Sequence, residues 1–401
     1  MKFKINGTIY SKGKINGDFI NKFSLTDYMI INNNTNQNLT YYYADNEGIL
    51  SEYSEIANIP SKGSYTFFNS LNIVPDNATR IIGMDSTNTI KDETTIPSSL
   101  KKNIGAKLYS VGLLSDIHID GNGDGNNSDS GDSQSDFTNA LEYFKDKGVD
   151  FICINGDVTY YGYDADYQAY KSLISNYSIP IKAVRGNHEC YVNGDSNYSY
   201  TNTKFQENIN ELYYEYIYNN DVYLFCGMYK ESTSNPFSDE ELIWLSNKLE
   251  EHKNKRVFLF VHYYYGDVGN ANNIVSIHKP ISNQTFINLI KNYKNVIYFS
   301  GHTHLAFDIQ RYSKDSNIKI AGDICHRVHI PSSCKPRTST SGSEGSYSNY
   351  FAGSEGYLME VYEKGIILKG INFETNKFLP IANYQLLCKA EDERWLNGNF
   401  N

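Results

Sequence analysis

KLYSVGLLSDIH, at residues 107–118, is an apolar run that ends directly in an Asp-x-His pair. The apolar pattern of residues 108–114 within this run predicts a buried β-strand. A second apolar run, FICIN at residues 151–155, ends in the same way, in Gly-Asp. Between the two runs, residues 135–147 place apolar side chains at helical spacing and are followed by a glycine, which predicts a helix that stops there. A strand, a helix and a strand in this order are typical of an α/β domain.

The alternation of strands and helices continues to residue 371. Ser238 begins a capping-box pattern, Ser-Asp-Glu-Glu, which predicts the start of another helix. The further predicted helices cover residues 164–177 and 285–290, and the further strands cover residues 179–184, 256–261, 296–299, 357–362 and 366–371. We therefore expect one α/β domain over residues 105–386, followed by a C-terminal tail over residues 387–401.

Residues 1–104 have a different pattern. Short alternating or apolar runs are separated by Asn-rich and Gly-containing turns, which predicts several short strands and a small all-β sandwich domain. The runs lie at residues 3–9, 27–31, 39–43, 64–68 and 79–83. The stretch 85–106 is rich in Thr, Ser and Lys and is predicted to be the linker. This N-terminal domain is expected to bind protein or glycan, to anchor the chain, or to be structural.

The composition excludes some classes of function. The 401 residues include 36 Lys and Arg against 46 Asp and Glu, a net charge of −10, and no basic patch stands out. A surface that docks duplex nucleic acid is therefore not expected, although a nucleotide remains a possible substrate. No apolar run approaches the roughly 18 residues of a membrane-spanning helix. The oligomeric state is left open.

The N-terminus and the cysteines bear on the compartment. Residues 1–20 alternate polar and apolar side chains and lack the apolar core of a signal peptide, which predicts a cytoplasmic protein or a component of a phage particle. The six cysteines show no paired spacing and are expected to be mostly reduced. Cys325 and Cys334 are the pair close enough in sequence to suggest a disulfide.

Five clusters of polar residues carry the candidate chemistry, and each directly follows a predicted strand. They are Asp116-Ile-His118, Gly156-Asp157, Gly186-Asn187-His188-Glu189, His262 and Gly301-His302-Thr-His304. The carboxyl ends of strands in an α/β sheet meet at one edge, where ligands bind. Carboxylates and neutral imidazoles bind Zn, Fe and Mn, and one carboxylate can bridge two metals about 3.5–4 Å apart. The glycines are expected to permit tight turns with positive φ. The clusters therefore predict a two-metal site.

These five motifs, in this order, resemble the calcineurin-like metallophosphoesterase superfamily over residues 107–371. The resemblance implies a four-layer α/β/β/α sandwich, here preceded by the small all-β domain. It also implies a hydrolase with a binuclear metal centre, in which a metal-bridging hydroxide attacks the phosphorus atom in line. Two divalent or trivalent ions are implied, and manganese, iron and zinc all fit the ligand types.

The resemblance further implies a role for each motif residue. The first metal would be held by Asp116, His118 and His304, the second by Asn187, His262 and His302, and both by the bridging carboxylate of Asp157. His188 would not be a ligand. It would contact the phosphate and protonate the leaving oxygen as the general acid.

The choice between a diester and a monoester substrate depends on finer features. The Asp-x-His motif and the helix with Tyr167-Gln-Ala-Tyr170 resemble the bacterial cyclic-nucleotide-phosphodiesterase-like branch, which favours a phosphodiesterase. The segment Gly156-Asp157-Val-Thr-Tyr160 also fits the Gly-Asp-x-x-Tyr motif of purple acid phosphatases, where the Tyr binds ferric iron. In that branch the first motif ends in Gly, whereas here it ends in His118. A phosphomonoesterase is the alternative function. Tyr160 is either a metal ligand or, more simply, a packing residue.

A second class of function is a particle or assembly component. In that interpretation residues 1–104 bind a glycan, a cell surface or a neighbouring protein. The phosphoesterase domain would then act on cell-surface phosphodiester polymers.

Several other residues carry weaker signals. Glu189 either orients His188 or a ligand, or caps a turn. His252 and His278 lie near charged segments that are expected to be exposed, and they receive no role. A group after the last metal motif either reaches the substrate from a loop or makes ordinary polar contacts, and it comprises His326, Arg327, His329 and Arg337.

Two stretches of low complexity predict loops, at residues 121–134 and 332–353. Residues 120–131 resemble the first half of a calcium-binding loop, but the twelfth position is Gly131 rather than Glu. The alternative is a flexible loop at the mouth of the site.

Overall fold

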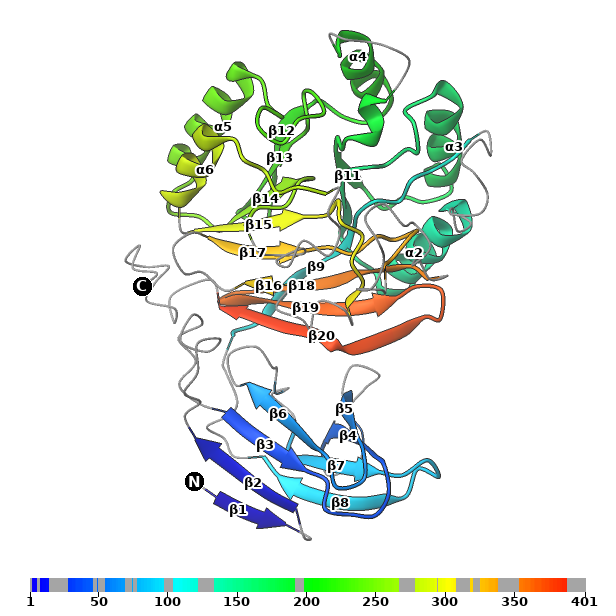
Figure 1. Cartoon of the computed structure of the whole chain (residues 1–401), viewed down its shortest axis with the longest axis vertical. Coiled ribbons are helices and arrows are strands. Elements are labelled where there is room, and N and C mark those ends of the chain that lie inside the picture. The colour runs from blue at the N-terminus through cyan, green and yellow to red at the C-terminus, as the bar shows by residue number, and fades with distance from the viewer. Residues whose placement is uncertain are drawn as a thin grey trace. The chain divides into compact units, whose positions relative to one another are not determined.

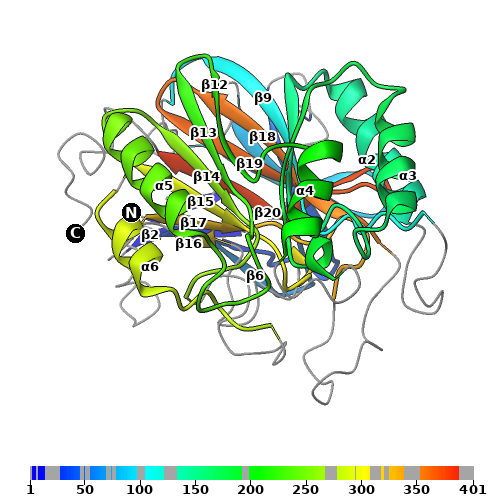
Figure 2. The same ribbon diagram turned by 90° about the horizontal axis from the view of Figure 1, so that it is seen from above.

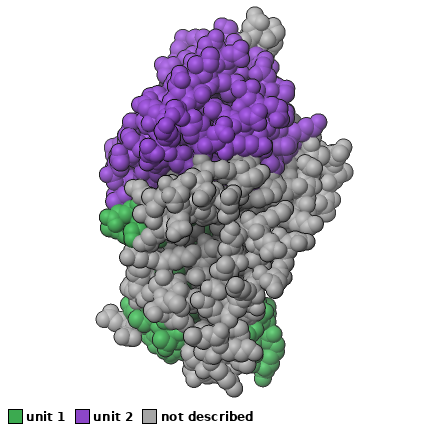
Figure 3. Space-filling model, turned by 90° about the vertical axis from the view of Figure 1, so that its left-hand side faces the viewer, with its two compact units in different colours: residues 1–106, 362–370, 378–387 green, residues 107–361, 371–377, 388–401 purple. Residues whose placement is uncertain are grey.

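The computed structural model places most of the chain, and its elements are labelled in Figure 1. The residues that it describes are 2–5, 8–13, 28–45, 49, 55–68, 74, 78–96, 104–121, 133–191, 198–266, 278–293, 295–307, 318–319, 325–337 and 353–387. Two compact units result, which Figure 3 colours separately. One contains residues 1–106, 362–370 and 378–387, and the other contains residues 107–361, 371–377 and 388–401.

The N-terminal region is all-β, as predicted, and consists of two four-stranded antiparallel sheets with the orders β1-β2-β3-β6 and β5-β4-β7-β8. The strands are β1 (Lys2–Ile5), β2 (Thr8–Gly13), β3 (Tyr28–Asn32), β4 (Leu39–Ala44), β5 (Glu55–Ile59), β6 (Ser64–Phe68), β7 (Arg80–Met84) and β8 (Ile90–Thr95). Ile31 from the first sheet and Leu39 and Ile59 from the second belong to one buried apolar cluster. A shared core between two sheets is the arrangement of a sandwich.

The prediction of a linker over residues 85–106 was wrong for its first half. Residues 90–95 form β8, which pairs with β7. The strand was missed because its sequence, IKDETT, is polar. Its Asp92 is nevertheless buried and accepts a hydrogen bond of 2.9 Å from the hydroxyl of Tyr41, so a polar pair replaces the expected apolar face.

The part of the chain that follows residue 106 contains two six-stranded sheets, with the orders β11-β10-β9-β18-β19-β20 and β12-β13-β14-β15-β17-β16. The first sheet is made of β9 (Lys107–Leu114), β10 (Phe151–Asn155), β11 (Ile181–Val184), β18 (Glu355–Tyr362), β19 (Gly365–Asn372) and β20 (Lys377–Leu387). The second is made of β12 (Tyr213–Tyr218), β13 (Asp221–Cys226), β14 (Val257–Val261), β15 (Val296–Ser300), β16 (Ile318–Lys319) and β17 (His326–His329). Strands β9, β10 and β11 run parallel, and so do β13, β14, β15 and β17.

Helices cover the outer face of each sheet, as Figure 2 shows. They are α2 (Ser133–Lys147), α3 (Asp164–Ile174), α4 (Ser199–Asn208), α5 (Asp239–Glu251) and α6 (Gln284–Lys291). Leu245 of α5 and Phe286 of α6 pack in one cluster with Leu259 of β14, and α2 presses Phe144 against Gly112 of β9. The predicted α/β/β/α layering is therefore confirmed.

Aromatic side chains fill the space between the two sheets. Phe225, Phe260 and Phe299, on three adjacent strands, stack with ring centroids 4.8–5.0 Å apart and interplanar angles of 9–16°. Phe151 of the opposite sheet meets Tyr223 edge to face at 5.0 Å. Each such pair adds about 0.5–1.5 kcal/mol beyond its buried area, so the ladder makes a stiff support for the strand ends.

Most predicted elements of this region are present, with small differences at their ends. The helix predicted over residues 164–177 stops at Ile174, because Ser175–Tyr177 form a turn instead. The hairpin of β12 and β13 was not predicted, although Asn219-Asn220 between its strands adopts the positive φ of a tight hairpin turn. Residues 326–329 form β17 rather than the loop that was expected.

No helix among the described residues is long and apolar enough to cross a membrane. The five cysteines within the described ranges are buried and none is in a disulfide, so Cys325 and Cys334 are not paired with each other. Of the calcium-loop-like stretch, residues 122–131 lie outside the described residues.

Candidate metal centre

The predicted ligands meet at one edge of the two sheets. Asp116 and His118 follow β9, Asp157 follows β10, and Asn187 follows β11 of the first sheet. His262 follows β14 of the second sheet, and His302 and His304 follow β15. All seven side chains lie in residues that are at most 7% exposed. The turns that follow strands of both sheets therefore bring these polar side chains together in one buried site.

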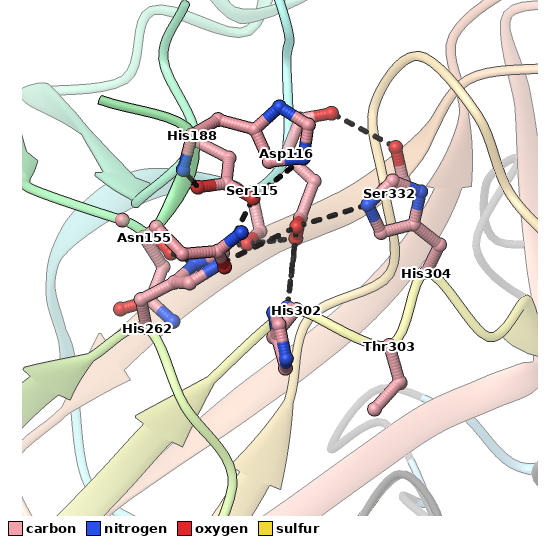
Figure 4. Close-up of polar contacts among 12 residues, drawn as sticks. Ser115, Asp116, Asn155, His188, His262, His302, Thr303, His304 and Ser332 are labelled. Carbon is pink, nitrogen blue, oxygen red and sulfur yellow. Dashed lines mark hydrogen bonds and ion pairs between the residues drawn. The ribbon is translucent and has the colours of Figure 1, made fainter. Parts of the chain in front are cut away.

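The first group of ligand atoms belongs to Asp116, His118, Asp157 and His304. One ligand atom from each residue lies within 4.8 Å of the others. The Nε2 atoms of His118 and His304 are 3.1 Å apart, and Nε2 of His304 lies 3.2 Å from Oδ1 of Asp116. Figure 4 shows the carboxylate of Asp116 joined by dashed lines to His302 and His304.

The second group contains Asp157, His262 and His302, whose ligand atoms also lie within 4.8 Å of one another. Nε2 of His262 is 3.0 Å from Oδ2 of Asp157 and 3.1 Å from Oδ1 of Asn187. Asn187 therefore extends this group with an amide oxygen. Because Asp157 belongs to both groups, it occupies the position of a bridging carboxylate.

The electrostatics of the two groups fit metal cations. Burial lowers the pKa of His262, but the carboxylates of Asp157 and Asp116 more than offset it and raise the pKa to about 9. The carboxylates thus draw positive charge into this buried space. Burial, together with the neighbouring His188, His304 and Lys335, lowers the pKa of His118 well below its usual value, which favours the neutral imidazole that binds metals. Imidazole nitrogens and carboxylate oxygens together suit Mn, Fe and Zn.

Main-chain carbonyls orient two of the imidazoles. Nδ1 of His262 lies 2.8 Å from the carbonyl oxygen of Asn155, and Nδ1 of His304 lies 3.2 Å from that of Lys335. A carbonyl oxygen only accepts, so each Nδ1 carries a hydrogen. Nε2 is then the nitrogen that faces the cluster, and it offers a lone pair to a metal ion when the imidazole is neutral.

The turns that present the ligands have unusual backbones. Five of the seven predicted ligands are non-glycine residues in the left-handed region, with φ between 46° and 75°: Asp116, His118, Asp157, His302 and His304. Such a conformation costs about 1–2 kcal/mol for an L-residue. Strain of this kind clusters at functional sites, where the surrounding structure enforces it.

Two of the three motif glycines serve a different purpose from the one predicted. Gly156 has a positive φ of 91°, but Gly186 and Gly301 do not. A Cβ atom on Gly186 would lie 2.1 Å from Oδ1 of Asp157, and one on Gly301 would lie 1.9 Å from Oγ of Ser115 and 2.6 Å from Oδ2 of Asp116. These two glycines are therefore required because ligand side chains lie directly against their Cα atoms.

His188 lies beside the ligands and opens to solvent. Its side chain is 22% exposed, and its Nε2 is 4.0 Å from Oδ2 of Asp157. Nδ1 donates to the carbonyl oxygen of Tyr160 at 2.7 Å, so Nε2 is the nitrogen available to a substrate. The ring of Tyr160 lies 5.7 Å from that of His188 and 5.9 Å from that of His118, centroid to centroid.

Glu189 is a buried brace between two ligand-bearing turns. Its Oε1 accepts from the amide and the hydroxyl of Thr159, at 2.7 and 2.9 Å, and its Oε2 accepts from the amide of Gly186 at 2.8 Å. Thr159 lies two residues after Asp157, and Gly186 precedes Asn187. Of the two predicted roles, Glu189 takes the structural one, and it fixes the turns rather than the ring of His188.

Tyr191 and Ser332 were not predicted to contribute to the site. The amide nitrogen of Asn187 donates to the hydroxyl of Tyr191 at 2.7 Å, which turns the amide oxygen of Asn187 toward His262. Ser332 Oγ donates to the main-chain oxygen of Asp116 at 2.8 Å, as Figure 4 shows, although residues 332–353 were expected to be a loop of low complexity. The aromatic residue after the Gly-Asn-His-Glu motif was the available signal for Tyr191.

Two of the remaining histidines, His252 and His278, differ from their predictions. His278 stacks on His302 with ring centroids 4.3 Å apart, so it belongs to the surroundings of the site. His252 is 3% exposed and forms an ion pair with Glu215 away from the ligands. His329 is fully buried, and its Nε2 contacts the hydroxyl of Thr303 at 3.1 Å, between two ligands. Neither His252 nor His278 is the exposed residue that was expected.

The structure also shows the positions of the other predicted residues that follow the last metal motif. His326 is buried within β17. The guanidinium of Arg327 is directed to the carbonyl oxygen of Tyr265 at 3.1 Å, and the main chain of Arg337 pairs with that of His304. These residues are thus part of a strand and a buried turn.

Comparison with known proteins agrees with this geometry. Residues 109–306 match the family model described as calcineurin-like phosphoesterase. A stretch of 156 residues is 24% identical to the probable glycerophosphodiester phosphodiesterase GpdQ of Arcobacter nitrofigilis, covering 39% of this chain and 56% of that protein. The chain thus spans little more than half the length of this curated relative.

Two solved phosphatase structures are similar to this chain. The purple acid phosphatase PPD1 from yellow lupin (Lupinus luteus) seeds gives a TM-score of 0.52 at 12% identity, over 91% of this chain and 72% of that chain. A dimetal phosphatase from Danio rerio gives a TM-score of 0.49 at 14% identity, over 71% of this chain and all of that chain. At such identities the lupin structure supports the fold alone. The family model, however, spans all seven predicted ligands, and residues 109–306 of this chain belong to the calcineurin-like metallophosphoesterase superfamily.

Proposed function

We propose that the chain is a metal-dependent phosphodiesterase. The observation that carries this proposal is the pair of buried ligand groups that share Asp157, with His188 beside them at the solvent side. Two metal ions bound there would activate water and neutralise the charge that develops on the phosphoryl oxygens. The first ion would be held by Asp116, His118, Asp157 and His304, and the second by Asp157, Asn187, His262 and His302.

His188 is proposed as the general acid. Its Nδ1–H is held by the carbonyl oxygen of Tyr160, so the ring cannot rotate away without losing that hydrogen bond. Its Nε2, when protonated, can donate to the oxygen of the leaving alcohol. General-acid catalysis of this kind contributes about 10²–10⁴-fold and matters most for a poor leaving group.

Sequence similarity is the reason for proposing a diester, and not a monoester, as the substrate. The curated relative with 24% identity is named as a probable glycerophosphodiester phosphodiesterase, and the Asp116-x-His118 motif favours the same kind of substrate. Glycerophosphodiesters and cyclic nucleotides are therefore the first natural substrates to test. Phosphomonoester hydrolysis is the competing function.

The test compares two chromogenic substrates on the full chain reconstituted with Mn²⁺. Bis-p-nitrophenyl phosphate reports diester cleavage and p-nitrophenyl phosphate reports monoester cleavage, with Asp157→Asn as the matched inactive control. We expect the diester to be cleaved with the higher kcat/KM. Faster cleavage of the monoester would replace the proposal with a phosphatase. No turnover of either substrate, with two metals bound, would contradict it.

A second comparison isolates His188. His188→Ala should retain both metals, because His188 is not in either ligand group. It should slow an alkyl diester by about 10²-fold or more and p-nitrophenyl esters much less, because p-nitrophenolate leaves without a proton. An equal loss on both substrates would show that His188 only positions the phosphate.

A further inference from the structure

Lys335 lies at the site although it belongs to none of the five motifs. It sits in the buried turn after β17, where its amide donates to Ser332 Oγ at 2.8 Å. The same Ser332 hydroxyl donates to the main-chain oxygen of Asp116 at 2.8 Å. The carbonyl oxygen of Lys335 accepts from Nδ1 of His304 at 3.2 Å. The backbone of Lys335 is therefore fixed to two residues of the first ligand group.

The side chain of Lys335 extends from this fixed backbone to the ring of Tyr160, which neighbours His188. Its Nζ lies 4.5 Å from the centroid of the Tyr160 ring, and that ring lies 5.7 Å from the ring of His188. The residue is only 5% exposed, so the ammonium group is held inside the protein and not on its outer surface. A cation over an aromatic face is attracted to the ring, which restrains its position.

We propose that Lys335 is a catalytic residue that binds a non-bridging oxygen of the substrate phosphoryl group from the side of the site that Tyr160 and His188 share. This inference rests on the proposed phosphoesterase function and adds a charged group to it. An ammonium group donates three hydrogen bonds, so it can serve a phosphoryl oxygen that His188 does not reach.

The placement gives Lys335 a distinct part in the reaction. A phosphoryl group gains negative charge on its equatorial oxygens as the transition state forms, and fixed positive charge near them stabilises that state more than the ground state. His188 must give up its proton to the leaving oxygen. Lys335 transfers no proton, so its charge remains constant through the step.

The first test measures phosphate binding without turnover. Inorganic phosphate is titrated into the Mn²⁺-loaded full chain by calorimetry, for the wild type and for Lys335→Met. Lys182→Met is the matched control, because Nζ of Lys182 also lies over a tyrosine ring, that of Tyr216, at 4.6 Å, but on β11 and β12 away from the ligands. We expect Lys335→Met to weaken phosphate binding at least tenfold with unchanged metal content, and Lys182→Met to bind as the wild type does.

The second test measures turnover of the better chromogenic ester. Lys335→Met should lower kcat/KM by about 10²-fold, the usual loss when one transition-state donor is removed. Lys335→Arg should recover part of that loss because it restores the charge. If Lys335→Met loses metal, Lys335→Gln takes its place in both tests.

Two outcomes would overturn the inference. One is phosphate affinity and kcat/KM of the Lys335 variants within twofold of Lys182→Met. The other is a uniform loss in Lys335→Met and Lys335→Arg, which would show that the backbone turn and not the charge is needed. If the wild type turns over no ester but phosphate binding still depends on Lys335, the phosphodiesterase proposal fails while this one stands.

Discussion

The substitution Gly186→Ala tests whether the ligand geometry depends on the close approach at this glycine. A Cβ atom at residue 186 would lie 2.1 Å from Oδ1 and 2.4 Å from the amide nitrogen of Asp157. Ordinary van der Waals contact begins near 3.4 Å, so Oδ1 must retreat by 3.4 − 2.1 = 1.3 Å. Oδ1 also accepts from the amide of His188 at 2.9 Å, and Oδ2 lies 3.0 Å from Nε2 of His262. Both contacts break when the carboxylate moves that far.

The expected loss follows from the size of this displacement. Misplacing a catalytic group by about 1 Å costs about 10²-fold in rate, which corresponds to about 2.7 kcal/mol of transition-state stabilisation. Because Asp157 belongs to both ligand groups, the variant should also bind less than two equivalents of metal. The overpacking itself should lower the free energy of unfolding by about 1–3 kcal/mol.

The assay measures bound metal by elemental analysis and kcat on the better chromogenic ester. Gly148→Ala is the control, because a Cβ atom there meets nothing within 4 Å, while its φ of 61° strains an alanine. The control should lose about 1–2 kcal/mol of stability and keep its metals and its rate. Full metal content and normal kcat in Gly186→Ala would refute the reasoning. So would an equal loss of activity in the two variants.

Three further predictions concern single side chains of the site. Asp157→Asn should remove most turnover and weaken the binding of both metals, and two tightly bound equivalents by elemental analysis would contradict the bridging position. Tyr191→Phe should weaken metal binding about tenfold or more by releasing the Asn187 amide, whereas Tyr161→Phe should not, in a calorimetric Mn²⁺ titration. Burial lowers the pKa of His329 to about 3, so between roughly pH 6.5 and pH 3 the unfolded chain binds a proton that the folded chain excludes. The free energy of unfolding that comes from a neutral His329 is therefore fully present above pH 6.5 and is lost on acidification. Urea unfolding from pH 7 to pH 4 should show that the free energy of unfolding falls less steeply with pH in His329→Gln than in the wild type.

The sequence was sufficient to predict the strands that carry the ligands. Residues 108–114 and 151–155 are apolar runs that end abruptly in polar motifs, so the strand and the functional turn are defined by the same boundary. The polar strand β8 and the hairpin of β12 and β13 were missed for opposite reasons. β8 buries Asp92 through a hydrogen bond to Tyr41, a partner 51 residues away that no local pattern reveals. The hairpin had a local signal in Asn219-Asn220.

The residues that surround the site were harder to predict from the sequence than the ligands themselves. Lys335 and His278 lie in segments without a motif, and they approach the cluster only because the chain returns to it after β17 and before α6. Gly186 and Gly301 were recognised as necessary, but the reason was misjudged, because a contact between a glycine Cα and a remote carboxylate is a tertiary feature. Side-chain type predicts which atoms meet a metal, whereas the groups that restrain those atoms depend on packing.

The left-handed turns have a consequence for protein design. Five ligands occupy backbone conformations that glycine would adopt freely, yet glycine has no side chain with which to coordinate an ion. An engineer who grafted these seven side chains onto another scaffold would have to reproduce the strained turns and the Glu189 brace along with them. The backbone conformation of this centre would thus have to be transferred as well, because the coordinating residues alone would not reproduce the metal site.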